Sequence, residues 1–374
     1  MTEDRKSDII ISETMNRAHK IRLYPTKEQE QILRQYVGGA RFAYNWCLDR
    51  WQKWVEEKKQ GLRTDAPNWI KLSRIWTVER PGWAKEIPRI SVAYAFKGVN
   101  TAFTLHFKNG LGWPKFKKKG RCRDSFRLSN DVCSIRKDGK HFHLPGIKNI
   151  RIAENLRFHG KVISYTISRS AGKWFVSVMM DVPDTRTAEK STCGVDVGLK
   201  IPAVCSDGSK VTLPWKKLSR LEKKVRRQEH YWSRKQTNSR RKLRARLKVQ
   251  QTYEKIGNIK RDIIHKFTSA VCKNHETVVI EDINLKGIHH LPKNIRKRTQ
   301  RSCISEVLNQ LAYKAINLVV ADKWYPSSQI CSNCGGRCKH DLKDRTYRCP
   351  TCGFEIGRDL NAAINLSKYP GSRG

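Results

Sequence analysis

Two C-x2-C pairs close to the C-terminus constrain the fold of this chain more than any other feature of its sequence. Cys331 and Cys334 form the first pair and Cys349 and Cys352 the second, with 14 residues between the two pairs. This spacing is typical of a zinc ribbon, in which two tight turns present four thiolates to one tetrahedral ion. The sequence therefore predicts a structural Zn(II) site within residues 327–353.

Two disulfides are the alternative interpretation of the same spacing. The first residues do not resemble a secretory signal, so we expect a reducing compartment, the prokaryotic cytoplasm near the nucleoid, and free thiols. Cys338 is expected to be a bystander, and Gly335 and Gly353 to let backbone amides turn towards the sulfurs. The other cysteines are scattered among apolar or basic neighbours: Cys47, Cys122, Cys133, Cys193, Cys205, Cys272 and Cys303.

The net charge indicates the class of partner. The 374 residues include 76 Lys and Arg against 34 Asp and Glu, a formal charge of +42. Such an excess repels itself unless a polyanion neutralises it, which argues against a small-molecule enzyme and predicts a nucleic acid partner, plausibly a long bound RNA. A membrane surface is disfavoured, because no apolar run approaches the roughly 20 residues of a spanning helix.

The strongest basic segment runs from Trp215 to Gln250 and holds fifteen Lys or Arg residues. Leu218, Leu221 and Val225 recur at helical spacing within it, so we predict a basic helical hairpin over residues 215–272 that turns at 236–239. The basic residues of such a hairpin can simply keep the protein soluble, but we expect them to line the groove of a nucleic acid duplex.

The first half of the chain combines strand and helix signals. A strand is predicted at 18–24, and Thr26 with Gln29 forms the capping-box signature of a helix that breaks or bends at Gly38-Gly39 and ends near Gly61. Two further helices are predicted at 68–82 and 90–107. The aromatic residues of 26–110 are expected mostly in the core, with a nucleic acid groove as the alternative place for some of them. The basic segment 113–123 is predicted to contact phosphates, and alternating strands at 162–167 and 174–179 complete a small antiparallel barrel.

Three acidic residues stand where buried strands end or a helix begins. Asp196 interrupts an apolar strand between Gly194 and Gly198, and Glu281 follows Thr277–Ile280, with Asp282 as the fallback. Asp359 precedes an apolar helical run, where an N-cap is the alternative role. A buried carboxylate is costly without a partner. If these elements pack together, the three acids can hold two catalytic Mg(II) ions. The ions make a histidine base unnecessary, so His289 and His290 are expected to be solvated or to contact phosphate.

Several motifs, taken in their order along the chain, closely resemble the TnpB family of transposon-encoded, RNA-guided DNA nucleases, which are relatives of type V CRISPR effectors. The resemblance covers almost the whole chain. The motifs are K-I-R-L-Y-P-T-K-E-Q-E at 20–30, G-W-P-K-F-K at 112–117, G-V-D-V-G-L-K at 194–200, V-V-I-E-D-I-N-L-K-G at 278–287, W-Y-P-S-S-Q-I-C-S-N-C-G at 324–335, C-P-T-C-G at 349–353 and R-D-L-N-A-A-I-N-L at 358–366.

The resemblance implies an α+β multidomain fold: an RNase H-like (RuvC) nuclease core with an inserted zinc ribbon, preceded by a small antiparallel β-barrel, the wedge, that carries a helical recognition insertion. It implies a guide RNA from the transposon end, one protein per RNA, and cleavage of double-stranded DNA that pairs with the guide beside a short adjacent motif. By position, the nuclease acids are Asp196, Glu281 and Asp359. The expected domains are a mobile tail at 1–14, the wedge at 15–25 and 115–190, the insertion at 26–114, the core at 191–326 and 354–374, and the ribbon at 327–353.

The chain departs from the family pattern at two places. Many members have an acid where this chain has Gly357, and the segment 308–320 is a few residues shorter than usual, so cleavage here could be slower. The competing functions are a guide-dependent DNA-binding regulator without cleavage and a zinc-ribbon accessory protein of a transposase. The presence of all three acids argues against both.

Overall fold

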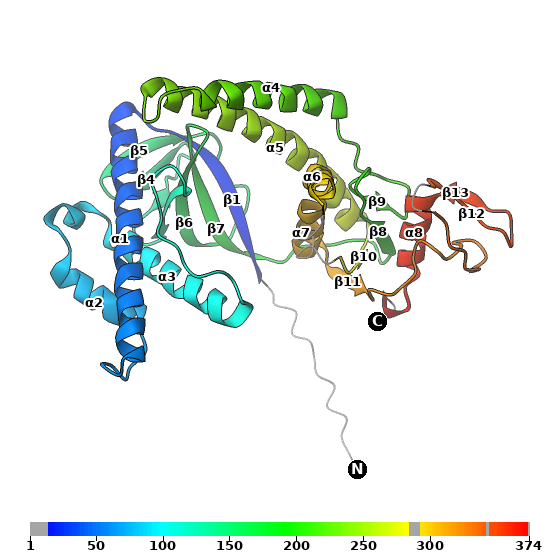
Figure 1. Ribbon diagram of the computed structural model, residues 1–374, viewed down its shortest axis with the longest axis horizontal. Coiled ribbons are helices and arrows are strands. Elements are labelled where there is room, and N and C mark those ends of the chain that lie inside the picture. Colours follow the sequence, from blue (N-terminus) through cyan, green and yellow to red (C-terminus); the bar gives the residue numbers. More distant parts are fainter. Residues whose placement is uncertain (1–13, 284–291, 342–343, 373–374) are drawn as a thin grey trace, which may run out of the picture. The chain divides into compact units, whose positions relative to one another are not determined.

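The computed structural model describes residues 14–283, 292–341 and 344–372 (Figure 1). The predicted mobile tail therefore lies outside the described residues, except for Thr14, which begins the first strand. His289 and His290 also lie outside them. The chain divides into two compact units, Met1–Asp184 and Thr185–Gly374.

The N-terminal unit is built on an antiparallel sheet of seven strands in the order β2-β6-β7-β1-β5-β4-β3. The longest pairing joins β1 to β7, from Thr14 opposite Pro183 to Leu23 opposite Trp174. Side chains along β7 alternate between buried and half-buried, because successive residues of a strand point to opposite faces. The strands are β1 (Thr14–Tyr24), β2 (Asp124–Ser129), β3 (Ser134–Ile135), β4 (His141–Leu144), β5 (Ile147–Ile152), β6 (Lys161–Ser170) and β7 (Lys173–Pro183).

This sheet is a half-barrel, where the sequence predicted a barrel. In the described part of the chain its end strands, β2 and β3, each pair on one side alone. Helix α1 (Lys27–Lys59) supplies Leu33, Tyr36 and Val37 to the core of the sheet. A helix thus buries apolar surface that further strands would cover in a closed barrel.

Helix α1 begins with the predicted capping box, in which the Gln29 amide donates to Thr26 Oγ1 (3.3 Å) and the Thr26 amide donates to Gln29 Oε1 (3.0 Å). Of the break or bend predicted at Gly38-Gly39, the break is wrong, because the helix is continuous from Lys27 to Lys59. A Cβ at position 39 would lie 2.1 Å from Ile87 Cδ1, so this glycine allows close packing, not a break.

The other helices of this unit, α2 (Trp69–Glu79) and α3 (Arg89–Asn109), match the predicted segments. They pack with α1 around an aromatic core. The Trp51 ring stacks on Phe103 with centroids 5.1 Å apart, and Trp76 is 3% exposed. Most aromatic residues here are therefore packing groups, as predicted.

The C-terminal unit contains a four-stranded mixed sheet in the order β11-β10-β8-β9. The strands are β8 (Thr192–Asp196), β9 (Val204–Cys205), β10 (Thr277–Glu281) and β11 (Asn317–Ala321), and the first, third and fourth run parallel. The helices are α4 (Trp215–Ser233), α5 (Arg240–Asn274), α6 (Lys293–Ser302), α7 (Ile304–Lys314) and α8 (Arg358–Ser367).

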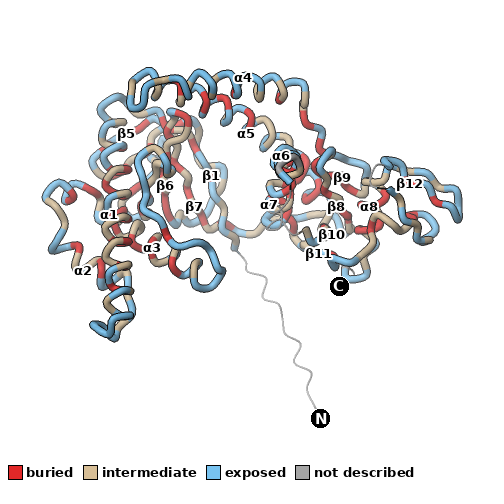
Figure 2. The backbone as a smooth tube through the Cα atoms, viewed as in Figure 1, coloured by how far each residue is buried: buried red, intermediate tan, exposed pale blue. Residues whose placement is uncertain are grey.

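The two faces of this sheet are covered by different helices. Cys193 and Val195 point into a core with residues of α5 and α7, such as Phe267 and Leu311. Gly194 faces α8, and a Cβ at this position would lie 2.1 Å from Ala363 O. Alternation along β8 therefore sends Asp196 to the face that α8 covers, and Figure 2 shows the buried strands between their helices.

Helices α4 and α5 form the predicted hairpin. The Ser239 side chain accepts a hydrogen bond from the Lys242 amide (3.1 Å) and so begins α5 at the predicted turn. A short two-stranded sheet, β12 (Thr346–Arg348) with β13 (Glu355–Gly357), precedes α8. Among the described residues, no helix is both long enough and apolar enough to cross a bilayer.

Candidate active site

Two of the predicted acids end neighbouring strands. Asp196 is the last residue of β8 and Glu281 the last residue of β10. Because β8 and β10 run parallel, with Val195 opposite Ile280, both carboxylates emerge at the same edge of the sheet.

The third acid comes from helix α8. Asp359 lies in the first turn of α8, and Gly357 takes the N-cap position without a side-chain hydrogen bond. The alternative role of Asp359 as the N-cap is therefore wrong. Because α8 packs directly on Gly194 of β8, its first turn reaches the edge of the sheet where Asp196 ends the strand.

Electrostatics links the three acids. Burial, and after it the charges of Glu281 and Asp359, together raise the pKa of Asp196 from its ordinary 3.8 to about 8, while Arg358 opposes the shift. Asp282 is not among the charges that act on Asp196, which favours Glu281 over its neighbour as the partner acid. Half-buried carboxylates whose negative charges act on one another are suited to hard cations such as Mg(II).

Among the described residues, two groups bring one ligand atom from each member within 4.8 Å of all the others, and the three acids are not one of these groups.

Glu281 also lines a cleft of about 310 Å³. The Ser327 hydroxyl donates a short hydrogen bond to Glu281 Oε1 and so fixes the orientation of the carboxylate. Trp324 stands in the same cleft and is 81% exposed, with Lys323 Nζ 5.2 Å from the centre of its ring. An exposed aromatic ring beside acids and lysine is a suitable surface for stacking a nucleotide base.

Two asparagines of α8 hold the segment 327–332, which includes the first cysteine of the cluster. The sequence analysis did not predict this role. Asn361 Oδ1 accepts from the Ser332 amide (2.9 Å), and Asn361 Nδ2 donates to Ile330 O (2.7 Å). Asn365 Nδ2 donates to the carbonyls of Ser327 (2.8 Å) and Ile330 (2.7 Å). The i, i+4 spacing of two asparagines on an apolar helix face was the available signal.

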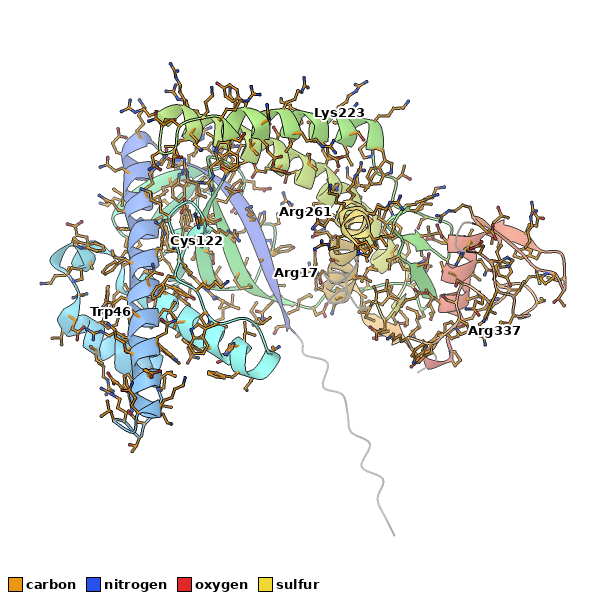
Figure 3. The ribbon with its side chains drawn as sticks, in the orientation of Figure 1. Arg17, Trp46, Cys122, Lys223, Arg261 and Arg337 are labelled. Carbon is orange, nitrogen blue, oxygen red and sulfur yellow. The ribbon has the colours of Figure 1, made fainter. Side chains whose placement is uncertain are left out.

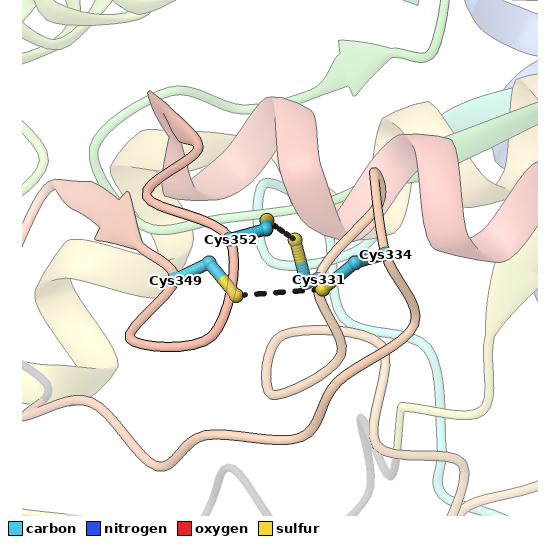
Figure 4. Close-up of side chains that lie close together, drawn as sticks. All are labelled: Cys331, Cys334, Cys349 and Cys352. Carbon is cyan, nitrogen blue, oxygen red and sulfur yellow. Dashed lines mark hydrogen bonds between the residues drawn. The ribbon is translucent and has the colours of Figure 1, made fainter.

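The four predicted cysteines form one cluster (Figure 4). Cys331 Sγ lies 3.8 Å from Cys352 Sγ, and Cys334 Sγ lies 3.5 Å from Cys349 Sγ. A tetrahedron with zinc–sulfur bonds of about 2.3 Å separates its sulfurs by about 3.8 Å. The cysteines are free thiols, which contradicts the disulfide alternative, and the donor set fits Zn(II).

The turns of the cluster follow the prediction. Gly335 (φ 77°) and Gly353 (φ 72°) are left-handed, and their amides donate to Cys331 O and Cys349 O. A hydrogen bond from the Cys352 amide lowers the pKa of the Cys349 thiol to about 6. Cys338 is not a member of the cluster, as expected.

Exposed basic side chains cover the outer face of α4, and Figure 3 shows Lys223 pointing away from the helix. The exposed members are Lys216, Lys217, Arg220, Lys223, Lys224, Arg226 and Arg227. In the N-terminal unit, a separate pocket of about 170 Å³ is lined by Arg41, Lys117, Arg123 and Arg127. Both surfaces can bind phosphate groups.

Comparison with protein families gives three consecutive matches. Residues 15–60 match a helix-turn-helix domain of IS605 OrfB proteins, residues 175–291 match the OrfB model described as "Probable transposase", and residues 305–366 match a Cas12f1-like TNB domain. In this structure the first of these segments holds strand β1 and the single helix α1.

Individual relatives cover nearly the whole chain. InsQ of Escherichia coli (strain K12), named as a candidate RNA-guided DNA endonuclease, is 29% identical over 93% of this chain and 91% of its own length. The TnpB-like protein L770 of Acanthamoeba polyphaga mimivirus is 22% identical over 94% of this chain and 72% of its own length. The fold resembles Cas12f1 in a cryo-EM structure of its complex with sgRNA and target DNA, with a TM-score of 0.54 and 14% identity over 95% of this chain and 99% of that one.

Proposed function

The chain belongs to the TnpB family, the OrfB proteins of IS605-type elements, and from this premise we propose that it is an RNA-guided, Mg(II)-dependent DNA endonuclease. The observation that supports the proposal is that the charges of Glu281 and Asp359 act on Asp196, whose pKa rises to about 8. A protein that only bound DNA would gain nothing from such a group of acids.

We assign the nuclease core to residues 191–326 and 354–374. Parallel strands β8 and β10, with α8 on one face and α5 on the other, support an RNase H-like (RuvC) architecture for it. The zinc ribbon is 327–353. In the N-terminal unit the half-barrel is the wedge, at 15–25 and 115–190, and the recognition insertion is 26–114.

The acids would hold two Mg(II) ions. The ions would supply Lewis acidity, activate a water and offset the charge that develops on a phosphodiester. Ser327 keeps one oxygen of Glu281 engaged, so the other oxygen is available for a metal.

The neighbouring residues would position the DNA strand. Trp324 would stack on a base, and Lys323 and Arg337, which line the same cleft, would contact the phosphates on either side. No histidine is needed as a general base in this arrangement.

The zinc ribbon would set the position of this cleft. Zn(II) held by Cys331, Cys334, Cys349 and Cys352 would order the loop that Asn361 and Asn365 fasten to α8. Since α8 also carries Asp359, the ribbon is coupled to the acids through a single helix.

The basic surfaces would bind the guide RNA and the target. The exposed face of α4 has seven basic side chains within residues 216–227, about three helical turns, an arrangement suited to the backbone of a duplex. The guide would come from the transposon end and select double-stranded DNA beside a short adjacent motif.

The proposal is tested on the protein copurified with its coexpressed RNA. We expect cleavage of a plasmid that carries the guide match, only when Mg(II) is present, and no cleavage by Asp196→Ala. Asp282→Ala is the matched control, because it removes the exposed acid next to Glu281, which is not among the charges that act on Asp196, and should leave cutting intact. Binding without cleavage by the wild-type protein would favour a guide-dependent DNA-binding regulator. Equal cutting by Asp196→Ala would refute the assignment of Asp196, Glu281 and Asp359 as the active site.

A further inference from the structure

A second cluster of metal-binding side chains lies in the C-terminal unit, apart from the acids and the zinc ribbon. Ligand atoms of Cys193, Cys205 and His275 all lie within 4.8 Å of one another. Cys193 is on β8, Cys205 is on the neighbouring strand β9, and His275 directly follows α5. Both thiols are completely buried.

The cluster is on the opposite face of the sheet from the candidate active site. Cys193 points into the core shared with α5, whereas Asp196, three residues further along β8, points towards α8. The two sites therefore share a strand but no side chain, and the nuclease proposal does not account for this cluster.

His275 is oriented as a metal ligand would be. Its Nδ1 lies 2.9 Å from Ser191 Oγ, and the single hydroxyl proton of Ser191 has an acceptor in Asn274 O at 3.1 Å. The Ser191 oxygen can then accept from Nδ1–H, which leaves the lone pair on Nε2. Nε2 is buried and has no hydrogen-bond partner among the described residues.

An orphaned ring nitrogen is costly inside a protein, because it has lost its bond to water without replacement. Buried cysteines alone are ordinary core residues. Two buried thiols that meet an unsatisfied imidazole nitrogen, with the other nitrogen held by a hydroxyl, form the donor set and outer shell of a zinc site.

The fourth ligand would be Asp207, which is beside the cluster but is not one of the three residues whose ligand atoms all lie within 4.8 Å of one another. It lies in the turn after β9, where Oδ1 accepts from the Ser209 amide (2.8 Å) and Oδ2 lies 3.7 Å from His275 Nε2. The Asp207 side chain also hydrogen-bonds with the Cys205 thiol. Oδ2 is thus on the side of the carboxylate that faces the cluster.

We propose that Cys193, Cys205, His275 and Asp207 bind a second structural Zn(II) ion. The soft thiolates and the imidazole select zinc over the hard cations that suit the acids. The ion would join β8, β9 and the end of α5, and so stiffen the strand that carries Asp196.

The test is the zinc content of the full chain, purified with its RNA and dialysed against chelator-free buffer. We expect two zinc ions per protein by elemental mass spectrometry. His275→Gln should retain one, a Cys193→Ala/Cys205→Ala variant should retain one, and a Cys349→Ser/Cys352→Ser variant should retain one. Combining His275→Gln with the ribbon changes should remove both.

Cys133→Ala is the matched control, because it removes a free thiol that is equally buried but has no such neighbours. It should keep both ions. If the double cysteine variant fails to fold, His275→Gln decides the question, since its side chain is partly exposed and its replacement spares the core. One zinc in the wild type that the ribbon changes remove entirely would overturn the proposal, as would a Cys193–Cys205 disulfide in peptide mass mapping.

Discussion

Replacing Asp196 with asparagine should abolish cleavage and at the same time stabilise the metal-free protein, and the gain should depend on pH. The folded protein keeps a proton on Asp196 up to about pH 8, whereas the unfolded chain releases it near 3.8. Between these values the folded state binds more protons, so the wild type loses stability as pH rises. Asparagine does not titrate. The difference in free energy of unfolding between Asp196→Asn and the wild type therefore grows from about pH 3.8 to about pH 8 and is constant above pH 8.

The size of the effect follows from the shift. The difference between pKa values of about 8 and 3.8, about 4.2 units, corresponds to about 6 kcal/mol at 1.36 kcal/mol per unit. By pH 5 the unfolded aspartate is already ionised, and about 1.5 kcal/mol of this difference has appeared. We therefore expect the advantage of Asp196→Asn in free energy of unfolding to increase by about 3–4 kcal/mol between pH 5 and pH 8.

The assay is urea unfolding of the C-terminal unit at both pH values, in magnesium-free buffer without a chelator, because a chelator would also remove zinc. Asp282→Asn is the control, since its carboxylate is exposed, and should show no such increase. Adding Mg(II) should stabilise the wild type and narrow the difference, because the ion binds the folded state. A difference that stays constant from pH 5 to pH 8 would mean that Asp196 is already ionised in the folded protein, and would refute the reasoning.

Three further predictions concern the surroundings of the site. Asn365→Ala removes two buried hydrogen bonds and should cost about 2–4 kcal/mol of stability by thermal unfolding; the exposed control Asn317→Ala should not, and an equal loss in both would contradict the role of Asn365. Trp324→Ala should leave the melting temperature unchanged but reduce the cleavage rate about tenfold, as expected for a lost stacking contact; undiminished cleavage would exclude stacking. A triple Lys223→Gln, Lys224→Gln and Arg227→Gln variant should reduce the slope of log affinity for RNA against log salt by about 2, whereas Lys266→Gln, whose Nζ is paired with Asp262 at 2.9 Å, should reduce it less.

Features encoded by near neighbours in sequence were predictable. The capping box at Thr26 and the turn before α5 each depend on residues that are a few positions apart. The cysteine cluster was predictable because four thiols at this spacing have few other uses. The break at Gly38-Gly39 was a wrong prediction for the complementary reason. The sequence shows a helix-weakening residue but not Ile87, which packs where a side chain would otherwise be.

The sequence predicted a barrel where the structure has a half-barrel, and the reason is related. Alternation within strands predicts a sheet with one apolar face, and β1, β6 and β7 have that pattern. Whether further strands or a helix cover the face depends on contacts such as those of Leu33 and Tyr36, which join segments far apart in the chain.

By itself the sequence determined the chemistry that is available: a polyanion-binding charge, four thiolates for one soft ion, and three acids at element ends. Tertiary structure decided which of these groups share an environment. Only the parallel register of β8 with β10 and the packing of α8 on Gly194 bring the field of two acids to Asp196, and only the pairing of β8 with β9 brings Cys205 and His275 to Cys193. The physical reason is that carboxylate fields and metal coordination act over a few ångströms, while the residues concerned are separated by up to 163 positions along the chain, from 196 to 359.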